Sequence, residues 1–317
     1  MVLILCLNAA VDKTVVVDDL RLRRLNRPAR VVTLPGGKGI NVARVLAGLG
    51  ERPLVLGFTA GYTGDFIERG LREEGISARW LRLARGHSRM CLAMLDGGGA
   101  PTELNEAGAV VGGPDLARLT SVCGRLSRAA RLVVMSGSLP PGCPAGTYSR
   151  LIREVRRHGR MVFLDTSGPA LKAGLAAGPD LVKLNREEAA FLGLPVRRTD
   201  ALARALEALA SRGPGARSRG PRAAIVTLGP AGAVAYFGGR RLVARPPRVR
   251  SVSPVGCGDT FLAGLANEIL SGAAPERALA FATALATASA LVPGAGVVRA
   301  ADVGPILKRV RVRVLSA

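Results

Sequence analysis

The sequence predicts an α/β protein built on a doubly wound, mostly parallel sheet. Short runs of apolar and β-branched residues alternate along the chain with longer segments whose apolar residues recur at the helical period. With 317 residues, 48% of them hydrophobic, the chain is long enough to bury a large core. We expect a single domain over residues 1–317, into which two segments, approximately 12–34 and 78–107, are inserted.

The alternation begins at the first residues, where an apolar run over 1–7 lacks the basic start and cleavage site of a signal peptide and is expected to be a buried strand. Short strands at 14–17 and 29–33, together with strand-like pieces at 78–83 and 89–95, are expected to form a small second sheet over the main one. The other expected strands are 53–58, 132–135, 161–164, 181–184, 223–227, 233–237 and 241–244, and the expected helices are 40–49, one ending near 74, 114–129, 145–158, 199–211, 259–271 and 276–291.

Composition restricts the class of function. The formal charge of +22 suggests nucleic-acid binding, but the arginines are spread along the chain, and only 3% of residues are aromatic. The densest basic cluster, residues 211–222, is rich in Gly and Pro and is expected to be a solvated loop.

The five cysteines are scattered and form no Cys-x-x-Cys pair, which disfavours a disulfide framework and a structural zinc site. No stretch approaches the ~20 apolar residues of a membrane span. We therefore expect a cytoplasmic protein without nucleic-acid or membrane partners.

Polar residues follow several of the predicted strands. In a doubly wound sheet, ligands bind outside the carboxyl ends of the strands. Each of these residues has an alternative role as a turn or cap residue, but together they indicate a binding cleft. They are Asn8 and Asp12, Ser136 and Ser138, Asp165, Lys183 and Asn185, and Thr227 with Gly229.

The stretch 253–264 joins a glycine-bracketed turn to an apolar helix. Gly256 and Gly258 permit backbone conformations that a side chain forbids, and the first N–H groups of the helix form an anion site. Asp259 stands at this helix start. It is either the N-cap, which Asp favours, or a general base beside an anion hole.

A second glycine-rich loop, 36–39, opens the helix near residue 40. It lacks the Ser or Thr and the earlier Gly of a Walker A loop, so a P-loop nucleotidase is disfavoured. It either simply starts the helix or brings bare backbone N–H groups and Lys38 to an anionic ligand with hydroxyl groups. Asn41 and Asp12 would then hydrogen-bond to those hydroxyls.

Residues 35–43 and 255–264 together resemble the two signatures of the PfkB, or ribokinase-like, carbohydrate kinases. The resemblance runs along nearly the full chain and implies the ribokinase-like fold, with the small sheet as a lid that a homodimer can share. The segments at 8–12, 102–105, 136–142, 164–168 and 182–185 are similar to the 1-phosphofructokinase and tagatose-6-phosphate kinase branch. That branch transfers the γ-phosphoryl of ATP to a phosphorylated ketohexose.

The resemblance also implies a role for each matching residue. Asp259 would be the catalytic base, and the backbone of Gly256, Cys257 and Gly258 the anion hole. The residues that would bind the phosphosugar are Asp12, Gly37, Lys38, Asn41, Arg89 and Ser138. Those that would line the nucleotide side are Lys183, Asn185, Thr227, Gly229 and Gly232. Glu188 would bind Mg²⁺. Positioning and charge neutralisation are what phosphoryl transfer requires.

Three residues depart from the family pattern: Ala9 and Leu184 stand where Pro is usual, and Cys257 where Ala or Ser is usual. The helix start predicts a reactive Cys257 thiol of lowered pKa, and the alternative is a small buried residue. We expect fructose 1-phosphate as the acceptor, with fructose 1,6-bisphosphate as product. The alternatives are a tagatose-6-phosphate kinase, another hexose kinase of the family, and a non-catalytic, basic nucleic-acid-binding or regulatory protein on the same fold.

Overall fold

A ten-stranded sheet forms the centre of the protein in the computed structural model, which describes residues 1–96, 101–211 and 221–315. The strands of this sheet are, along the chain, β1 (Val2–Cys6), β4 (Pro53–Thr59), β5 (Ser77–Arg82), β8 (Leu132–Ser136), β9 (Met161–Asp165), β10 (Leu181–Leu184), β11 (Ala223–Thr227), β12 (Ala233–Phe237), β13 (Arg240–Arg245) and β14 (Arg311–Val314). Their order in space is β14-β13-β12-β11-β10-β9-β8-β1-β4-β5. Pairing is parallel from β5 to β11 and antiparallel from β11 to β14, which confirms the predicted, mostly parallel sheet.

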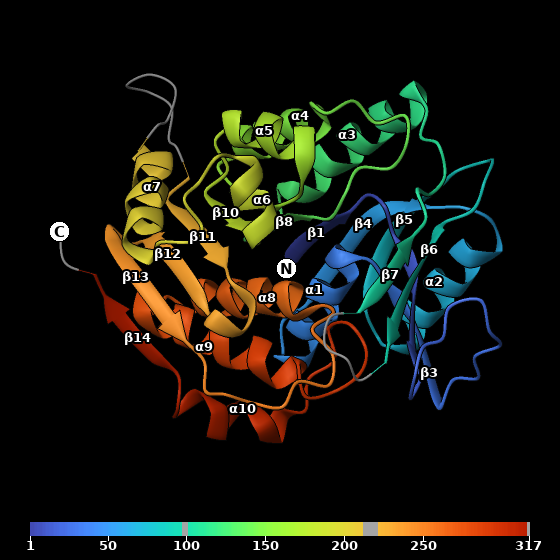
Figure 1. Cartoon of the computed structure of the whole chain (residues 1–317). Helices are drawn as coiled ribbons and strands as arrows, with labels where there is room; N and C mark the ends of the chain where they lie inside the picture. The colour runs from blue at the N-terminus through green and yellow to red at the C-terminus, as the bar shows by residue number, and fades with distance from the viewer. Residues whose placement is uncertain (97–100, 212–220, 316–317) are drawn as a thin grey trace.

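Helices cover both faces of the sheet (Figure 1), as a parallel sheet requires. The apolar side chains of α1 (Lys38–Gly48), α2 (Gly61–Glu73), α8 (Cys257–Leu270) and α9 (Pro275–Ser289) pack into one core cluster. Those of α3 (Gly113–Ser127), α4 (Thr147–Arg157), α5 (Gly168–Ala176) and α7 (Thr199–Ser211) pack into the other. Strand β1, buried along its whole length, contributes Val2 and Ile4 to the first cluster and Leu3 and Leu5 to the second.

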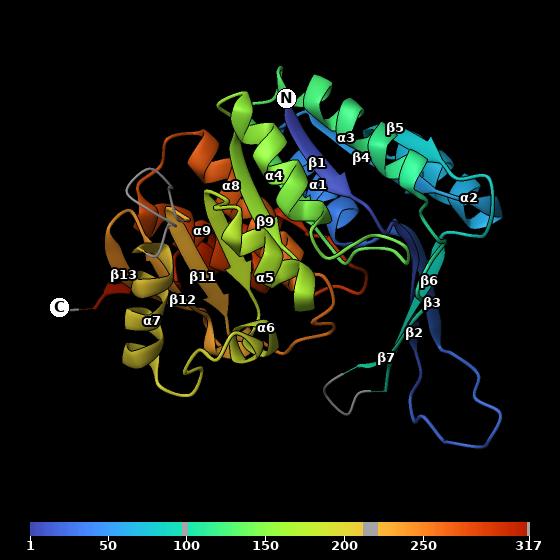
Figure 2. The same ribbon diagram turned by 90° about the horizontal axis from the view of Figure 1, so that it is seen from above.

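A separate four-stranded sheet projects from one end of the molecule (Figure 2). Its strands are β2 (Ala10–Val16), β3 (Arg30–Gly36), β6 (Arg89–Leu95) and β7 (Thr102–Asn105), in the order β3-β2-β6-β7. This small sheet contains three of the four strands that the sequence assigned to it. The assignment of 78–83 to the small sheet was wrong. That segment is β5, which pairs in parallel with β4 because helix α2 connects the two strands as a crossover.

Several short elements were not predicted. They are α5, α6 (Arg186–Phe191), α10 (Ala300–Leu307) and β14. Helix α6 has six residues, too few for a periodic pattern, and α10 contains Pro305, which the patterns treat as a helix breaker. Most of the basic cluster at 211–222 lies outside the described residues. Within the described ranges, the structure contains no helix long and apolar enough to cross a membrane.

Candidate active site

Helix α8 begins at Cys257, two residues earlier than predicted, and Gly256 is its N-cap. Gly256 has a left-handed backbone (φ 78°), and a Cβ there would lie 2.8 Å from the Cα of Ala295, so only glycine fits this turn. Asp259 therefore occupies the third helical position, and its side chain makes no capping hydrogen bond. The interpretation of Asp259 as the N-cap was wrong.

The Asp259 carboxylate instead points toward helix α1. Its Oδ2 accepts a hydrogen bond from Nδ2 of Asn41, at 2.9 Å, and only 3% of Asn41 and 5% of Asp259 is exposed. Burial of an ionisable carboxylate without an Arg or Lys directly paired to it is costly. Such a group in a cleft is a candidate for chemistry.

A buried cluster of opposite charges lies beside Asp259. Asp165, at the end of β9, accepts hydrogen bonds from the ammonium groups of Lys38 and Lys183, each at 3.0 Å. The carboxylate of Glu188 lies 3.5 Å from the Lys38 ammonium. Asp165 and Lys183 are almost completely buried, whereas 34% of the Lys38 side chain is exposed. The cluster therefore has one face open toward solvent, at Lys38.

These charges determine how the carboxylates ionise. Burial alone would raise the pKa of Asp165, but the charges of Lys183 and Lys38 outweigh it and hold that pKa below its usual value. At Lys38 the neighbouring carboxylates likewise outweigh burial and raise the pKa. Asp259 has no such direct partner, and burial raises its pKa to about 7. Asp259 is therefore poised to exchange a proton near neutral pH.

The predicted acceptor residues lie together at the junction with the small sheet. Asp12 accepts a hydrogen bond from the backbone N–H of Gly37, at 3.1 Å. Nε of Arg89 donates to the carbonyl of Asn8, at 3.1 Å. Nδ2 of Asn8 in turn donates to Oγ of Ser138, at 3.3 Å. These contacts bring residues from β2, β6 and the loop after β8 to one place. Lys38 lies instead with Asp165 and Glu188.

The predicted nucleotide residues lie at the carboxyl ends of β10 and β11. Asn185 and Glu188 form a capping box on α6: Oδ1 of Asn185 accepts from the N–H of Glu188, and Oε2 of Glu188 accepts from the N–H of Asn185, both at 2.8 Å. Thr227 donates from Oγ1 to the carbonyl of Leu184, at 3.2 Å. Gly232 has φ 93°, and a Cβ there would lie 1.9 Å from the carbonyl oxygen of Ala244.

Lys183 connects this side to the start of α8. A Cβ on Gly258 would lie 3.1 Å from Nζ of Lys183, so the ammonium sits directly against the first turn of the helix. The backbone N–H groups at a helix start and a buried ammonium both favour negative charge. The geometry therefore combines two features that stabilise an anion at the same point.

A magnesium ion fits the acidic groups only with help from a substrate. Within the described ranges, no group of three or more His, Cys, Asp or Glu side chains is arranged to hold a metal ion. Oε1 of Glu188 faces Lys38, whereas Oε2 is held by the capping box. Mg²⁺ commonly binds one or two carboxylates and completes its shell with water and substrate phosphates. Oε1 of Glu188, which lies outside the capping box but is paired with Lys38, is the oxygen that would hold the ion together with substrate phosphates.

The thiol of Cys257 does not have the reactive character that its position suggested. Burial, followed by the charge of Asp259, raises its pKa to about 12. Its Sγ lies 3.8 Å from the carbonyl oxygen of Ser253, in a weak hydrogen bond. The prediction of a lowered pKa was wrong, because desolvation at this site exceeds the effect of the helix dipole.

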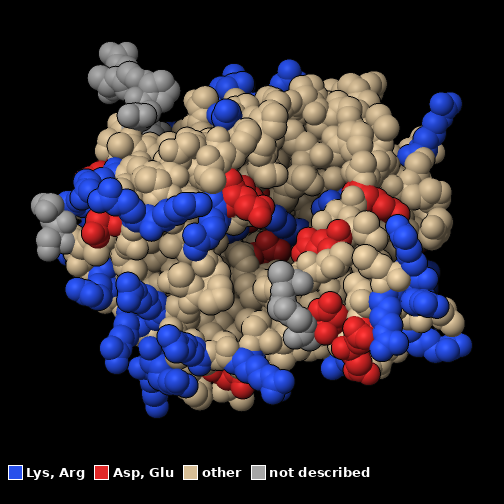
Figure 3. Space-filling view, viewed as in Figure 1, with Lys and Arg blue, Asp and Glu red and all other residues tan. Residues whose placement is uncertain are grey.

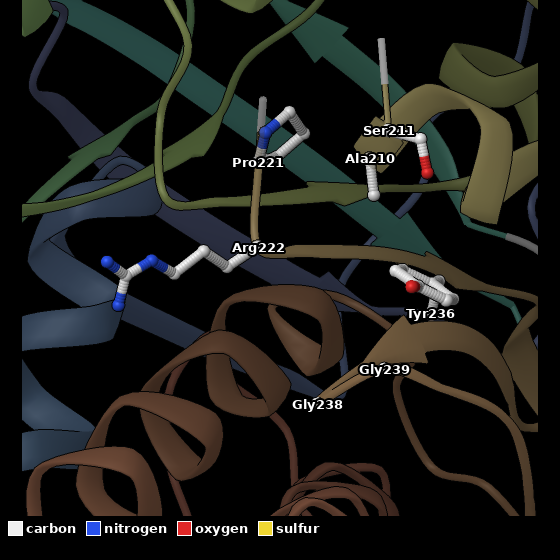
Figure 4. A pocket seen from close by; sticks show the side chains of 7 residues that line it. All are labelled: Ala210, Ser211, Pro221, Arg222, Tyr236, Gly238 and Gly239. Atoms are coloured by element: carbon white, nitrogen blue, oxygen red, sulfur yellow. The ribbon is translucent and has the colours of Figure 1, made fainter. Parts of the chain in front are cut away.

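A second depression lies away from this site. Figure 3 shows acidic and basic side chains meeting in a hollow near the centre of the face seen in Figure 1. The depression in Figure 4 is lined by Pro221 and Arg222 before β11 and by Gly238 and Gly239 after β12. It therefore lies at the amino end of β11, whereas Asp259 lies near the carboxyl ends of the strands, and its described lining residues include no acidic side chain.

Comparison with known proteins identifies the family. The model of the pfkB family of carbohydrate kinases matches residues 3–300. The chain is a pfkB-family carbohydrate kinase. A 1-phosphofructokinase of Xanthomonas campestris pv. campestris is 36% identical over 285 residues, which cover 88% of this chain and 87% of that protein. A tagatose-6-phosphate kinase of Staphylococcus epidermidis is 30% identical over 314 residues, which cover 98% and 99%.

Solved structures agree with this assignment. Phosphofructokinase-2 from Escherichia coli, crystallised with potassium, superposes with a TM-score of 0.87 at 26% identity and covers 98% of each chain. The predicted family and the ribokinase-like fold of this pfkB-family kinase are thus confirmed.

Asp165 was predicted among the polar residues of a binding cleft because it follows an apolar run, and the structure joins it to Lys38 and Lys183. One residue beside Asp259 was missed. Arg44 hydrogen-bonds to Asn41, at 3.1 Å, and its position on the buried side of α1 could not be read from the helical pattern.

Proposed function

We propose that this pfkB-family kinase transfers the γ-phosphoryl of ATP to a phosphorylated ketohexose, with fructose 1-phosphate as the acceptor and fructose 1,6-bisphosphate as the product. The observation that carries the proposal is Asp259, a buried carboxylate with a pKa raised to about 7 on the first turn of a helix. The greater identity to the 1-phosphofructokinase favours fructose 1-phosphate over tagatose 6-phosphate.

In this mechanism Asp259 takes the proton from the acceptor hydroxyl as the hydroxyl oxygen attacks the γ-phosphorus. A base whose pKa lies near the working pH combines adequate ionisation with adequate basicity. The negative charge that spreads over the transferred group is met by the first N–H groups of α8, at Gly256, Cys257 and Gly258. Lys183 lies against that turn. Preorganised donors of this kind supply much of the rate in phosphoryl transfer.

The acceptor side would bind a sugar that already carries a phosphate. Arg89 is the cation of this group, and its guanidinium suits bidentate binding of a phosphate. Asp12, Gly37, Asn41 and Ser138 supply hydrogen-bonding groups around it. Lys38 was expected to bind the same phosphate. Because it contacts Asp165 and Glu188, we propose instead that it meets the phosphoryl group in transfer.

On the opposite side, the carboxyl ends of β10 and β11 would bind ATP. Lys183, Asn185, Thr227, Gly229 and Gly232 come from these strand ends and the loops that follow. Glu188 would hold Mg²⁺ through its oxygen outside the capping box. The bound ion would neutralise charge on the nucleotide phosphates.

The small sheet is proposed to act as a lid and to pair with the lid of a second copy of the chain. Exposed apolar side chains lie on its two edge strands, where 44% of Val31 and 60% of Leu104 is accessible, and on the segment between β2 and β3, where 83% of Leu22 and 79% of Leu25 is accessible. Exposed apolar groups on a projecting segment favour association. Size-exclusion chromatography with light scattering should give a dimer, which Leu22→Glu with Leu25→Glu converts to a monomer. A monomeric parent protein would contradict the pairing.

The predicted single domain and cytoplasmic location stay predictions.

The central experiment measures ADP release with Mg-ATP and a panel of acceptors. Fructose 1-phosphate should give the highest kcat/KM, above tagatose 6-phosphate, fructose 6-phosphate and unphosphorylated hexoses. If none of the phosphosugars is turned over and the protein binds nucleic acid at physiological salt, the non-catalytic alternative would be favoured.

Asp259→Asn tests the base. We expect kcat to fall by ~10²–10⁴, the usual contribution of general-base catalysis, with ATP binding and the melting temperature retained. Glu268→Gln is the matched control, because Glu268 is also a buried carboxylate of α8 but lies near the end of that helix and pairs with Arg277 of α9. Near-parental activity of Asp259→Asn would refute the role of base.

A further inference from the structure

Arg44, on the largely buried helix α1, makes an unusually complete set of hydrogen bonds. Nε and Nη2 donate to the two oxygens of Glu74 on α2, at 2.7 and 2.9 Å. Nη2 also donates to the carbonyl of Pro35, at 2.5 Å, and Nη1 to the carbonyl of Ala295 and to Oδ1 of Asn41, both at 3.1 Å. The five N–H groups of a guanidinium are thus all used.

The contact with Asn41 has a consequence for Asp259. An amide has an oxygen that only accepts and a nitrogen that only donates. Because Arg44 occupies the oxygen, the nitrogen of Asn41 must face the other way, where it donates to Oδ2 of Asp259. Without the guanidinium, only the carboxylates of Asp259 and Asp12, which the side chain of Asn41 also contacts, would hold the amide in this orientation. A reversed amide would place an oxygen against the Asp259 carboxylate.

The remaining contacts of Arg44 support the same geometry. Pro35 lies near the end of β3, just before α1, and Ala295 packs against the Gly256 turn that starts α8. Glu74 holds the guanidinium from α2. One side chain thus ties helix α1 to the segment that precedes it and to the turn beside the anion hole.

We propose that Arg44 is a positioning residue that acts through Asn41 to orient the Asp259 carboxylate and to favour its ionised form. The proposal rests on the function proposed for Asp259, but its effect on the carboxylate can be measured without turnover. A residue that only holds α1 and α2 together would stabilise the fold and leave the ionisation of Asp259 unchanged.

The sign of the effect follows from the groups that face Asp259. Burial and the charge of Asp165 raise its pKa, whereas Lys38, Lys183 and the hydrogen bond from Asn41 lower it. Loss of the Asn41 hydrogen bond therefore raises the pKa. A hydrogen bond to a charged group corresponds to about one to two pKa units, so we expect a rise of about one unit in Arg44→Met.

Two measurements test the proposal on Arg44→Met. The first is the pKa of Asp259 in the free enzyme, from carbon-13 NMR titration of labelled aspartate carboxyls, with the signal assigned by Asp259→Asn. The second is the pH dependence of kcat/KM, which reports the free enzyme. We expect its acidic limb to move to higher pH by the same amount, and kcat to fall by ~10–100-fold, as it does when catalytic groups are misplaced. The KM for ATP should not change.

Arg131→Met is the matched control, because Arg131 also joins a carboxylate and a backbone carbonyl, those of Glu51 and Leu270, at the amino end of β8. It should leave both the pKa of Asp259 and the pH profile unchanged. Arg44→Lys, which keeps the charge but loses the planar fork, should recover kcat only in part.

An unchanged pKa of Asp259 in Arg44→Met overturns the proposal, whatever happens to stability. A shifted pKa in Arg44→Met, together with full activity of Asp259→Asn, would leave the positioning role intact and refute the catalytic one. The two failures are therefore distinguishable.

Discussion

Asp165→Asn should destabilise the protein and change its response to pH. Asp165 is completely buried and bridges two lysines. Removal of one partner from a buried ion pair costs about 3–5 kcal/mol, because the other charge stays buried without compensation. That range applies to Lys183, of which 2% is exposed; Lys38, 34% exposed, can be hydrated and adds little.

The expected loss converts to a change in melting temperature. An unfolding entropy of about 2.1 cal/mol/K per residue gives roughly 0.7 kcal/mol/K for a chain of this length. The melting temperature of Asp165→Asn should therefore fall by roughly 4–8 °C at pH 7. Asp180→Asn is the control, since Asp180 precedes β10 at the amino ends of the strands, accepts a hydrogen bond from the N–H of Val162, which an Asn oxygen can also accept, and pairs only distantly with Arg222, at 3.9 Å.

The direction of the Asp165 pKa shift determines how the stability difference between parent and Asp165→Asn changes with pH. The folded-state pKa of Asp165 is lowered, so its contribution to the free energy of unfolding is present above the unfolded value of about 3.9 and is lost as pH falls through the folded pKa. The difference between parent and Asp165→Asn should thus be largest at neutral pH and shrink below about pH 4.

The same substitution should move the catalytic pH profile. In the parent protein, kcat/KM should fall as pH drops below the Asp259 pKa of about 7. Because the charge of Asp165 raises that pKa, Asp165→Asn should shift the acidic limb to lower pH. Urea unfolding of the parent and Asp165→Asn across pH 3–8 measures the difference in stability. Initial rates in the same buffers measure the position of the acidic limb. A stability loss independent of pH, or an acidic limb that moves upward, would refute the reasoning.

Two further predictions concern single side chains. Arg89→Ala should raise the KM for the phosphosugar about tenfold or more, the value of a charge-assisted hydrogen bond, with little change in the KM for ATP; an equal rise in both would place Arg89 outside the acceptor site. Cys257, whose pKa is raised to about 12, should be alkylated by iodoacetamide at pH 7.5 no faster than Cys143, and Cys257→Ala should stay active. Rapid labelling of Cys257 with loss of activity, blocked by ATP, would contradict this.

The family, the mostly parallel sheet and most positions of its strands could be predicted from the sequence. Apolar runs such as 223–227 and 233–237 match β11 and β12 at both ends, because a strand buried on both faces is continuously apolar. Two glycine-rich junctions far apart in the chain also identified the kinase family, since backbone conformations near phosphates admit few residues other than glycine.

Only the tertiary structure decided how the residues of the site share their tasks. Asp259 is not a cap because the helix begins two residues earlier, at the Gly256 turn that packs against Ala295. Lys38 lies beside Asp165, which is 127 positions away along the chain. Desolvation raises the pKa of Cys257, although its helix position alone suggested the opposite. Each of these outcomes depends on which distant groups meet in a buried space, and local sequence patterns contain no information about that.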